Sequence, residues 1–169
     1  ETGTALAETG MEIAGATFAC SPKVIGCAPR PRIRAGWMDY ENADALVETD
    51  WLADRLNDSG IRIVDATWYL PDVDRSGRDE HAERHIPGAV YWDLDEIADP
   101  ADPLPHMLPD AATFAGHMAR LGIGDGMKVV VYDGVGSMTA PRVWWTLRSF
   151  GHDDVVVLDG GLAKWLAED

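Results

Sequence analysis

The sequence predicts an α/β fold built on a central, mostly parallel sheet with helices on both faces. Two nearly all-apolar segments, 128–132 and 155–158, are typical of strands that are buried on both sides, as in parallel sheets. Segments with apolar residues at helical spacing alternate with these strands, and short Gly- and Asp-rich turns connect them. The 169 residues are enough for one such domain.

The first half of the regular region predicts two helices and two strands. Thr49 precedes 50–56, which predicts an N-cap followed by a short helix. A short apolar strand is predicted over 62–65. The polar segment 77–85 predicts a helix toward its end, and a Pro-Gly turn then leads into a strand over 89–92.

The second half predicts three more helices around the two apolar strands. Apolar residues recur at helical spacing over 110–121, and Gly122 predicts the end of that helix. A second helix is predicted over 140–150, between the two strands. A final helix is predicted over 162–167.

The charge balance excludes two classes of partner. The chain carries 14 Lys and Arg against 29 Asp and Glu, a formal net charge of −15. Binding to phosphate groups needs clustered cations, so this balance argues against nucleic acid and against an anionic membrane surface as partners. The sequence also has no apolar run long enough for a membrane-spanning helix.

Residues 1–37 differ in kind from the rest of the chain. They hold four basic and three acidic residues, which leaves 10 basic and 26 acidic residues, a net charge of −16, for residues 38–169. This first segment lacks sustained periodicity, and we interpret it as a disordered leader or an upstream extension. Cys20 and Cys27 both lie in it, and two cysteines give no sign of an oxidising compartment. A cytoplasmic location is therefore expected.

Chemistry in a parallel sheet is expected at the carboxyl ends of the strands, which singles out the loops after Asp65, Tyr132 and Leu158. The loop after Tyr132 contains Gly134 and Gly136 and opens a helix, where backbone N–H groups can cradle an anion. A dinucleotide-binding fingerprint would also need glycine at position 139, and a serine nucleophile elbow would need it at 135 and 139. A tight strand-to-helix turn is the simplest interpretation.

Two histidines, His81 and His85, are spaced so that a helix would put them on one face. A zinc-protease helix would carry Glu at position 82, where Ala stands, so hydrogen-bonded or solvated histidines are expected and no metal or cofactor is implied. The many aspartates between 72 and 102 show no spacing that selects a catalytic pair, and they predict a solvated acidic surface.

Eight short motifs follow one another in an order that is highly specific. They are Asp65-Ala66-Thr67-Trp68-Tyr69-Leu70-Pro71, His85-Ile86-Pro87-Gly88-Ala89, Asp93-Leu94-Asp95, Pro105-His106-Met107-Leu108-Pro109, Val131-Tyr132-Asp133-Gly134, Ala140-Pro141-Arg142-Val143-Trp144-Trp145, Phe150-Gly151-His152 and Leu158-Asp159-Gly160-Gly161. In this order they resemble the N-terminal domain of tandem rhodanese-type sulfurtransferases, which use thiosulfate or 3-mercaptopyruvate. The resemblance runs from about residue 46 to residue 166.

This resemblance implies a rhodanese-like fold for 38–169 and a second, catalytic domain that this chain lacks. In the catalytic domain of that family, a cysteine directly follows the strand that corresponds to 128–132 and carries sulfur as a persulfide. Asp133 stands at that position here. A carboxylate cannot hold sulfane sulfur and repels anionic donors. The resemblance therefore implies a degenerate active-site loop with no catalytic residue, made of Asp133, Gly134, Gly136 and Ser137.

The resemblance also implies partners and a pocket between two domains. The expected partners are a C-terminal rhodanese domain of the same protein, a small anionic sulfur donor and a thiol or cyanide acceptor. The residues implied for the pocket are His85, Asp74, Arg75 and Arg142. Asp74 would substitute for an aspartate that the family carries where Ser76 stands, and Arg142 would bind anionic substrate or pair with an aspartate. The alternative function is a stand-alone inactive rhodanese-like module for binding or regulation.

Overall fold

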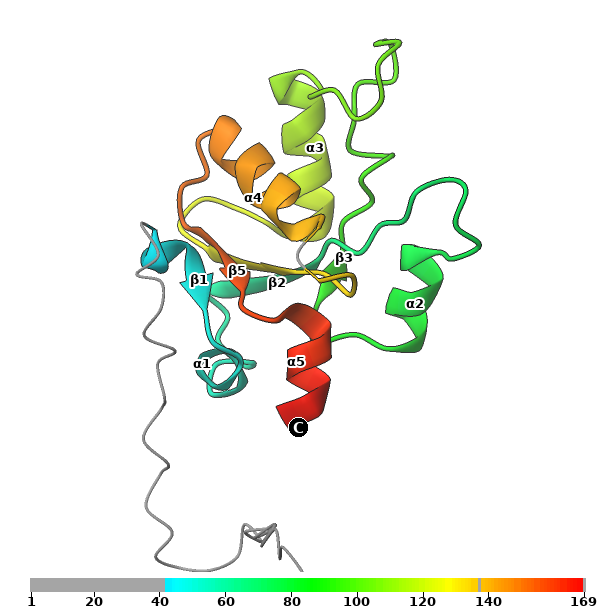
Figure 1. Ribbon diagram of the computed structural model, residues 1–169. Coiled ribbons are helices and arrows are strands. Elements are labelled where there is room, and N and C mark those ends of the chain that lie inside the picture. Colours follow the sequence, from blue (N-terminus) through cyan, green and yellow to red (C-terminus); the bar gives the residue numbers. More distant parts are fainter. Residues whose placement is uncertain (1–41, 137, 169) are drawn as a thin grey trace, which may run out of the picture. The chain divides into compact units, whose positions relative to one another are not determined.

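A five-stranded parallel sheet forms the centre of the domain (Figure 1). The computed structural model describes residues 42–136 and 138–168. The strands are ordered β1-β5-β4-β2-β3, and every neighbouring pair is parallel. Their bounds are β1 (Leu46–Val47), β2 (Ile61–Asp65), β3 (Val90–Tyr91), β4 (Lys128–Tyr132) and β5 (Val155–Leu158).

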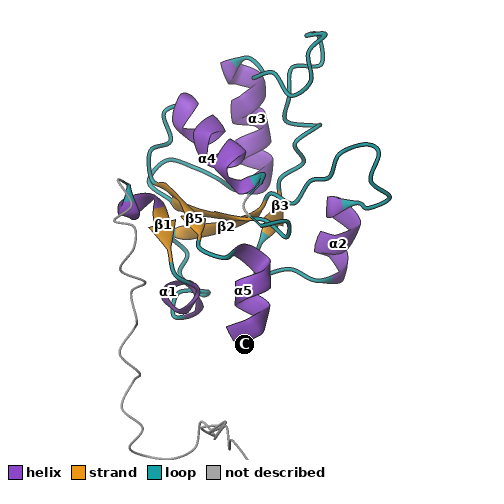
Figure 2. Cartoon of the chain, in the orientation of Figure 1, coloured by secondary structure: helices purple, strands orange, loops and turns teal. Residues whose placement is uncertain are grey.

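Helices cover both faces of this sheet, as Figure 2 shows. A short 3-10 helix (Ala43–Ala45) precedes β1, and the α-helices are α1 (Thr49–Ala53), α2 (Gly77–Glu83), α3 (Ala111–Leu121), α4 (Ala140–Ser149) and α5 (Gly161–Glu168). α3 and α4 lie on one face and α1 and α5 on the other, while α2 lies beside β3. This confirms the predicted α/β architecture.

Strand β4 shows why both faces must be covered. Val129 and Val131 face the core under α3 and α4, whereas Val130 and Tyr132 face the core under α1 and α5. All four side chains are fully buried. Because alternate residues of a strand point to opposite faces, an all-apolar strand is stable only between two layers, and each such side chain contributes roughly 1.5–3 kcal/mol by leaving water.

The predicted helix over 110–121 is confirmed, and its ends show why the sequence signal was strong. The Asp110 carboxylate accepts the N–H groups of Ala112 at 2.9 Å and Thr113 at 3.0 Å, and so caps the first turn of α3. Gly122 ends the helix with φ +67°, a left-handed conformation that glycine adopts without steric cost.

Three local expectations were wrong. Thr49 lies inside α1, which ends at Ala53, and Glu48 takes the cap position without a side-chain hydrogen bond. The helix expected toward the end of 77–85 begins at Gly77 instead, because the Ser76 hydroxyl accepts the N–H of Asp79 at 3.2 Å. Strand β1 was missed, since two residues are too few to show a periodic pattern.

The described helices set one limit on location. Within residues 42–136 and 138–168, no helix has the length and apolar character that crossing a membrane requires. The expected leader over 1–37, with Cys20 and Cys27, lies outside the described residues.

Candidate functional site at the carboxyl ends of the strands

The three loops singled out from the sequence meet at Asp133. The N–H of Gly134 donates to the Thr67 hydroxyl at 2.9 Å, which joins the loop after β4 to the loop after β2. The N–H of Leu162 donates to the Asp133 carbonyl at 3.1 Å, which brings in the loop after β5. The connections from β2 and from β4 leave in opposite directions along the sheet, so the loops meet at a topological switch point, where ligands of such sheets bind.

Glycines let these loops approach so closely. A Cβ on Gly161 would lie 2.5 Å from the Asp133 carbonyl oxygen, and the residue has φ +55°. A Cβ on Gly77, at the start of α2, would lie 2.0 Å from the Thr67 carbonyl oxygen. Side chains at either position would push the loops apart, because such distances are far inside van der Waals contact.

The Asp133 carboxylate fills a cradle of backbone N–H groups made by its own loop. One oxygen accepts the N–H groups of Thr139 at 2.9 Å and Ala140 at 2.8 Å, where α4 begins. The other oxygen accepts the N–H of Val135 at 3.1 Å. The residue is only 1% exposed. The anion that a helix N-terminus attracts is therefore supplied by the chain itself.

This arrangement has a chemical consequence for the loop. The N–H groups that could stabilise a sulfur anion are committed to a carboxylate, and a carboxylate oxygen does not form a persulfide. Gly136, with φ +81°, makes the turn that sequence analysis assigned to a glycine. Ser137, the other predicted member of the loop, lies outside the described residues.

A second buried carboxylate, Asp65, lies at the end of β2 and was not recognised from sequence. Its Oδ1 accepts the N–H and the hydroxyl of Thr67, at 3.0 and 2.6 Å. Its Oδ2 accepts the Tyr132 hydroxyl at 3.1 Å and the His81 Nδ1–H at 3.0 Å. The position of Asp65 directly after an apolar strand was the available signal, but its partners come from β4 and α2, distant in sequence.

The tyrosines around Asp65 act as hydrogen-bond donors. Burial and the charge of Asp65 raise the pKa of the Tyr132 hydroxyl well above its usual value of 10.0. Burial and the neighbouring aspartates raise the pKa of Tyr91 to about 12. Both hydroxyls stay protonated at neutral pH, and that of Tyr91 donates to the Thr67 carbonyl at 2.9 Å.

His81 lies in α2 beside Asp65, and His85, just beyond the end of that helix, packs against it. The rings of His81 and His85 stack with centroids 4.3 Å apart and planes 20° apart. The His85 Nδ1–H donates to the His81 carbonyl at 2.6 Å, and His85 is exposed. The structure thus shows the hydrogen-bonded histidines that the sequence predicted.

Two other pocket candidates, Asp74 and Arg75, are not brought to His85. Arg75 donates two hydrogen bonds to Glu80, at 2.6 and 2.9 Å, and stacks 4.2 Å from the Tyr69 ring. Asp74 is exposed in the loop before α2. Among the described residues, the His85 ring makes one hydrogen bond, to the carbonyl of His81.

Arg142, the fourth pocket candidate, is held by a loop. Its Nη2 donates to the carbonyl of His106, and its guanidinium lies 4.8 Å from the Trp145 ring. Among the described residues, Arg142 forms no ion pair with an aspartate, and a main-chain carbonyl instead of a carboxylate receives its hydrogen bond. His106 in turn contacts Asp95 through Nε2 at 2.8 Å, which anchors the loop before α3.

A protein-family model for the rhodanese-like domain matches residues 48–168. This chain belongs to the rhodanese-like domain family. It is 46% identical over 131 residues to 3-mercaptopyruvate sulfurtransferase of Homo sapiens and 48% identical over 130 residues to thiosulfate sulfurtransferase of Bos taurus. These matches cover 74% and 73% of this chain but only 44% and 43% of the relatives. The chain therefore spans less than half the length of these two proteins.

A solved structure confirms the rhodanese-like fold. The crystal structure of SseA from Escherichia coli, described as a 3-mercaptopyruvate sulfotransferase with the rhodanese fold, superimposes with a TM-score of 0.71 at 44% identity. The superposition covers 74% of this chain and 48% of that one.

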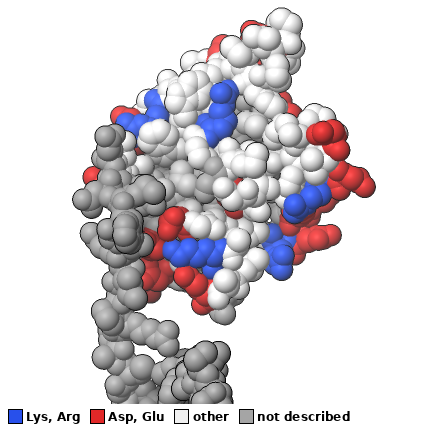
Figure 3. Space-filling view, viewed as in Figure 1, with Lys and Arg blue, Asp and Glu red and all other residues white. Residues whose placement is uncertain are grey.

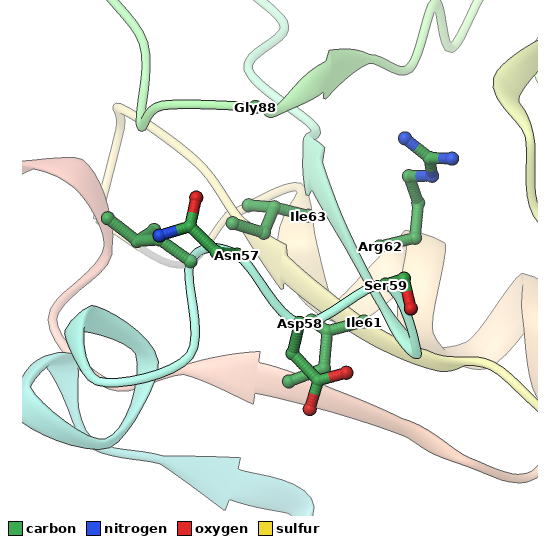
Figure 4. A pocket seen from close by; sticks show the side chains of 8 residues that line it. Asn57, Asp58, Ser59, Ile61, Arg62, Ile63 and Gly88 are labelled. Atoms are coloured by element: carbon green, nitrogen blue, oxygen red, sulfur yellow. The ribbon is translucent and has the colours of Figure 1, made fainter.

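A pocket of about 300 Å³ lies at the opposite end of β2 in this rhodanese-like domain (Figure 4). Leu56, Ile61 and Ile63 line it together with Asp58 and Gly88. Asp58 is used in a local turn, where it accepts the N–H of Gly60 at 2.8 Å. The pocket lies at the amino ends of β2 and β3, away from the loops that meet at Asp133, and it carries no cluster of reactive side chains.

The surface of the rhodanese-like domain shows mixed charges on the face in Figure 3, where basic side chains lie next to acidic ones. The ion pairs of Arg78 with Asp93 at 2.6 Å and of Lys164 with Glu48 at 2.6 Å are examples. Among the described residues, no group of His, Cys, Asp and Glu side chains is arranged to hold a metal ion.

Proposed function

We propose that this chain is the non-catalytic rhodanese-like domain of a tandem sulfurtransferase. The observation that carries the proposal is Asp133, because its carboxylate occupies the cradle in which the family's catalytic cysteine would hold sulfur. The similarity to named sulfurtransferases, over less than half of their length, supports the same assignment. A cysteine of a second domain would then perform the chemistry.

The reaction proposed for the whole enzyme is the transfer of one sulfane sulfur. With thiosulfate as donor, the cysteine thiolate attacks the outer sulfur, the S–S bond breaks and sulfite leaves with its electron pair. The persulfide then passes its terminal sulfur to cyanide or to a thiol, and the thiolate is restored. The alternative donor, 3-mercaptopyruvate, is equally supported, since relatives with both names are similar to this chain.

The contribution proposed for this domain is to pack on the catalytic domain and to line its pocket. Six exposed large apolar side chains lie in the loops at the carboxyl edge of the sheet or in the adjacent part of α4. They are Leu70, Val73, Leu104, Met107, Met138 and Trp145. Exposed apolar groups concentrated at one edge are typical of an interaction surface. His85 and Arg142 would face the pocket from this edge.

A turnover assay on the chain alone tests the proposal. Thiocyanate formation from thiosulfate and cyanide should not exceed background, because the loop holds a carboxylate in place of a thiolate. A catalytic rhodanese provides the positive control. Turnover that persists after Cys20→Ser and Cys27→Ser would contradict the role given to Asp133.

The coding sequence beyond Asp169 separates this proposal from the alternative. A second rhodanese-like domain with a cysteine after its corresponding strand is expected. A stop codon at that point would instead support a stand-alone module that binds or regulates another protein.

A further inference from the structure

We propose that Asp65 and His81 form a positioning pair for His85, and that they present the Nε2 atom of His85 to the proposed pocket as a hydrogen-bond acceptor for an N–H or O–H group of a ligand. The inference rests on the proposed function only for the pocket that His85 would face. Its structural basis is the chain of contacts from a buried carboxylate, through a half-buried imidazole, to an exposed one.

The first contact fixes His81. The side chain of Asp65 is 2% exposed and that of His81 is 16% exposed, so water competes little for the bond between them. A carboxylate only accepts hydrogen bonds from nitrogen, so Nδ1 of His81 must carry the proton. The remaining three donors to Asp65 come from Thr67 and Tyr132, which hold the carboxylate itself in place.

The second contact fixes His85. Its Nδ1 donates to the carbonyl of His81, one of the carbonyls that the end of α2 leaves without a helical N–H partner. A carbonyl also only accepts, so the neutral His85 ring carries its proton on Nδ1 and keeps Nε2 as a hydrogen-bond acceptor. An exposed hydrogen bond of this kind is weak by itself, because water replaces it readily. The stacked His81 ring supplies the surface that holds the His85 ring against that carbonyl.

The carboxylate that supports His85 is a different residue from the one expected from the sequence. Asp74 was expected to support His85, yet it is exposed in another loop. The carboxylate that supports His85 is instead Asp65, which acts at one remove through His81. A third ring, that of Tyr91, lies with its centroid 5.5 Å from that of His81, at an interplanar angle of 43°.

Nitrogen-15 NMR of the histidine side chains tests this arrangement in the full chain, because it distinguishes the Nδ1–H from the Nε2–H form. His85 is expected mainly as Nδ1–H in the wild-type chain at a pH where it is neutral. In His81→Ala the Nε2–H form should become the major one, and the ring-current shift of His85 should be lost. His106→Asn is the matched control, since it removes the other Asp–His pair and should leave the His85 signals unchanged.

A second variant covers a failure of His81→Ala to fold. His81→Phe keeps a ring for stacking but cannot donate to Asp65, so it should retain the ring-current shift while the two proton forms of His85 become mixed. Unchanged His85 signals in either folded variant would overturn the positioning role. These measurements need no turnover, so a full-length protein without sulfur transfer would overturn the proposed function and leave the positioning of His85 to be decided by NMR.

Discussion

Replacement of Asp133 by alanine is expected to destabilise the domain strongly. The change removes the acceptor of three backbone N–H groups, of which those of Thr139 and Ala140 are buried at 8% and 1% residue exposure. A buried N–H without a partner costs about 1–3 kcal/mol, and the lost charge at the start of α4 adds up to about 1 kcal/mol. The variant no longer buries a charged carboxylate, and the desolvation cost that it avoids offsets part of this loss. The expected loss is about 3 kcal/mol, out of a total of roughly 5–15 kcal/mol for a domain.

Urea unfolding followed by tryptophan fluorescence measures this loss. About 3 kcal/mol corresponds to a fall of roughly 1–3 M in the urea midpoint for the slopes usual in small domains, with the slope itself unchanged. Asp110→Ala is the matched control, because Asp110 also caps a helix with its carboxylate but is exposed. Water can replace the exposed cap, so the control should lose much less.

A conservative variant separates charge from shape. Asp133→Asn keeps one acceptor oxygen but places an NH₂ group against the N–H of Val135, so it should cost about 1–2 kcal/mol. If Asp133→Ala lost no more stability than Asp110→Ala, the carboxylate would not be the anchor of this loop. The physical basis for proposing that the domain is non-catalytic would then fail with it.

Three further predictions concern other parts of the domain. Gly161→Ala should destabilise the domain by about 1–3 kcal/mol, through backbone strain and the clash with the Asp133 carbonyl. Gly116→Ala in α3, where a Cβ meets nothing, should instead stabilise it by up to about 1 kcal/mol. Thermal unfolding would contradict this pair of predictions if both variants changed the stability in the same direction. The hydrogen bonds from Arg75 hold the pKa of Glu80 below its usual 4.5. Arg75→Gln should therefore lower the stability above pH 4.5, and the loss should shrink as the pH falls through the lowered pKa of Glu80. A loss of stability that is independent of pH in urea titrations would exclude this pairing. The isolated chain should bind a hydrophobic dye through its exposed apolar side chains. The double variant Met138→Ser/Trp145→Ser should lower the dye fluorescence more than Leu166→Ser does. Equal effects would refute an interaction surface at the carboxyl edge of the sheet.

The fold was largely predictable because its signals are local. The nearly all-apolar strands predicted over 128–132 and 155–158 match β4 and β5 residue for residue. Gly122 marked the end of α3 correctly, since capping depends on residues within one turn, and the helix predicted from residue 110 begins one residue later, after the Asp110 cap. The capping signal at Thr49 was misleading. It is read from local sequence alone, whereas the start of α1 also depends on how that helix packs against the sheet.

The site was predictable only as a set of loops. Parallel topology required the loops after Asp65, Tyr132 and Leu158 to lie at one edge, and they do meet at Asp133. The partners of Arg75 and Arg142 did not follow from sequence. Both are long side chains on an exposed edge, so a nearby glutamate or a carbonyl from a distant loop could satisfy either one.

The sequence by itself determined the α/β architecture, the order of the motifs and the presence of Asp133 where a catalytic domain needs a cysteine. Only the tertiary structure decided that this carboxylate fills its own N–H cradle, and that Asp65 joins Tyr132 to His81. The physical reason is the range of the interactions. Hydrophobic periodicity and capping are written within a few residues, whereas the partners of a buried charge come together only when strands distant in sequence are packed side by side.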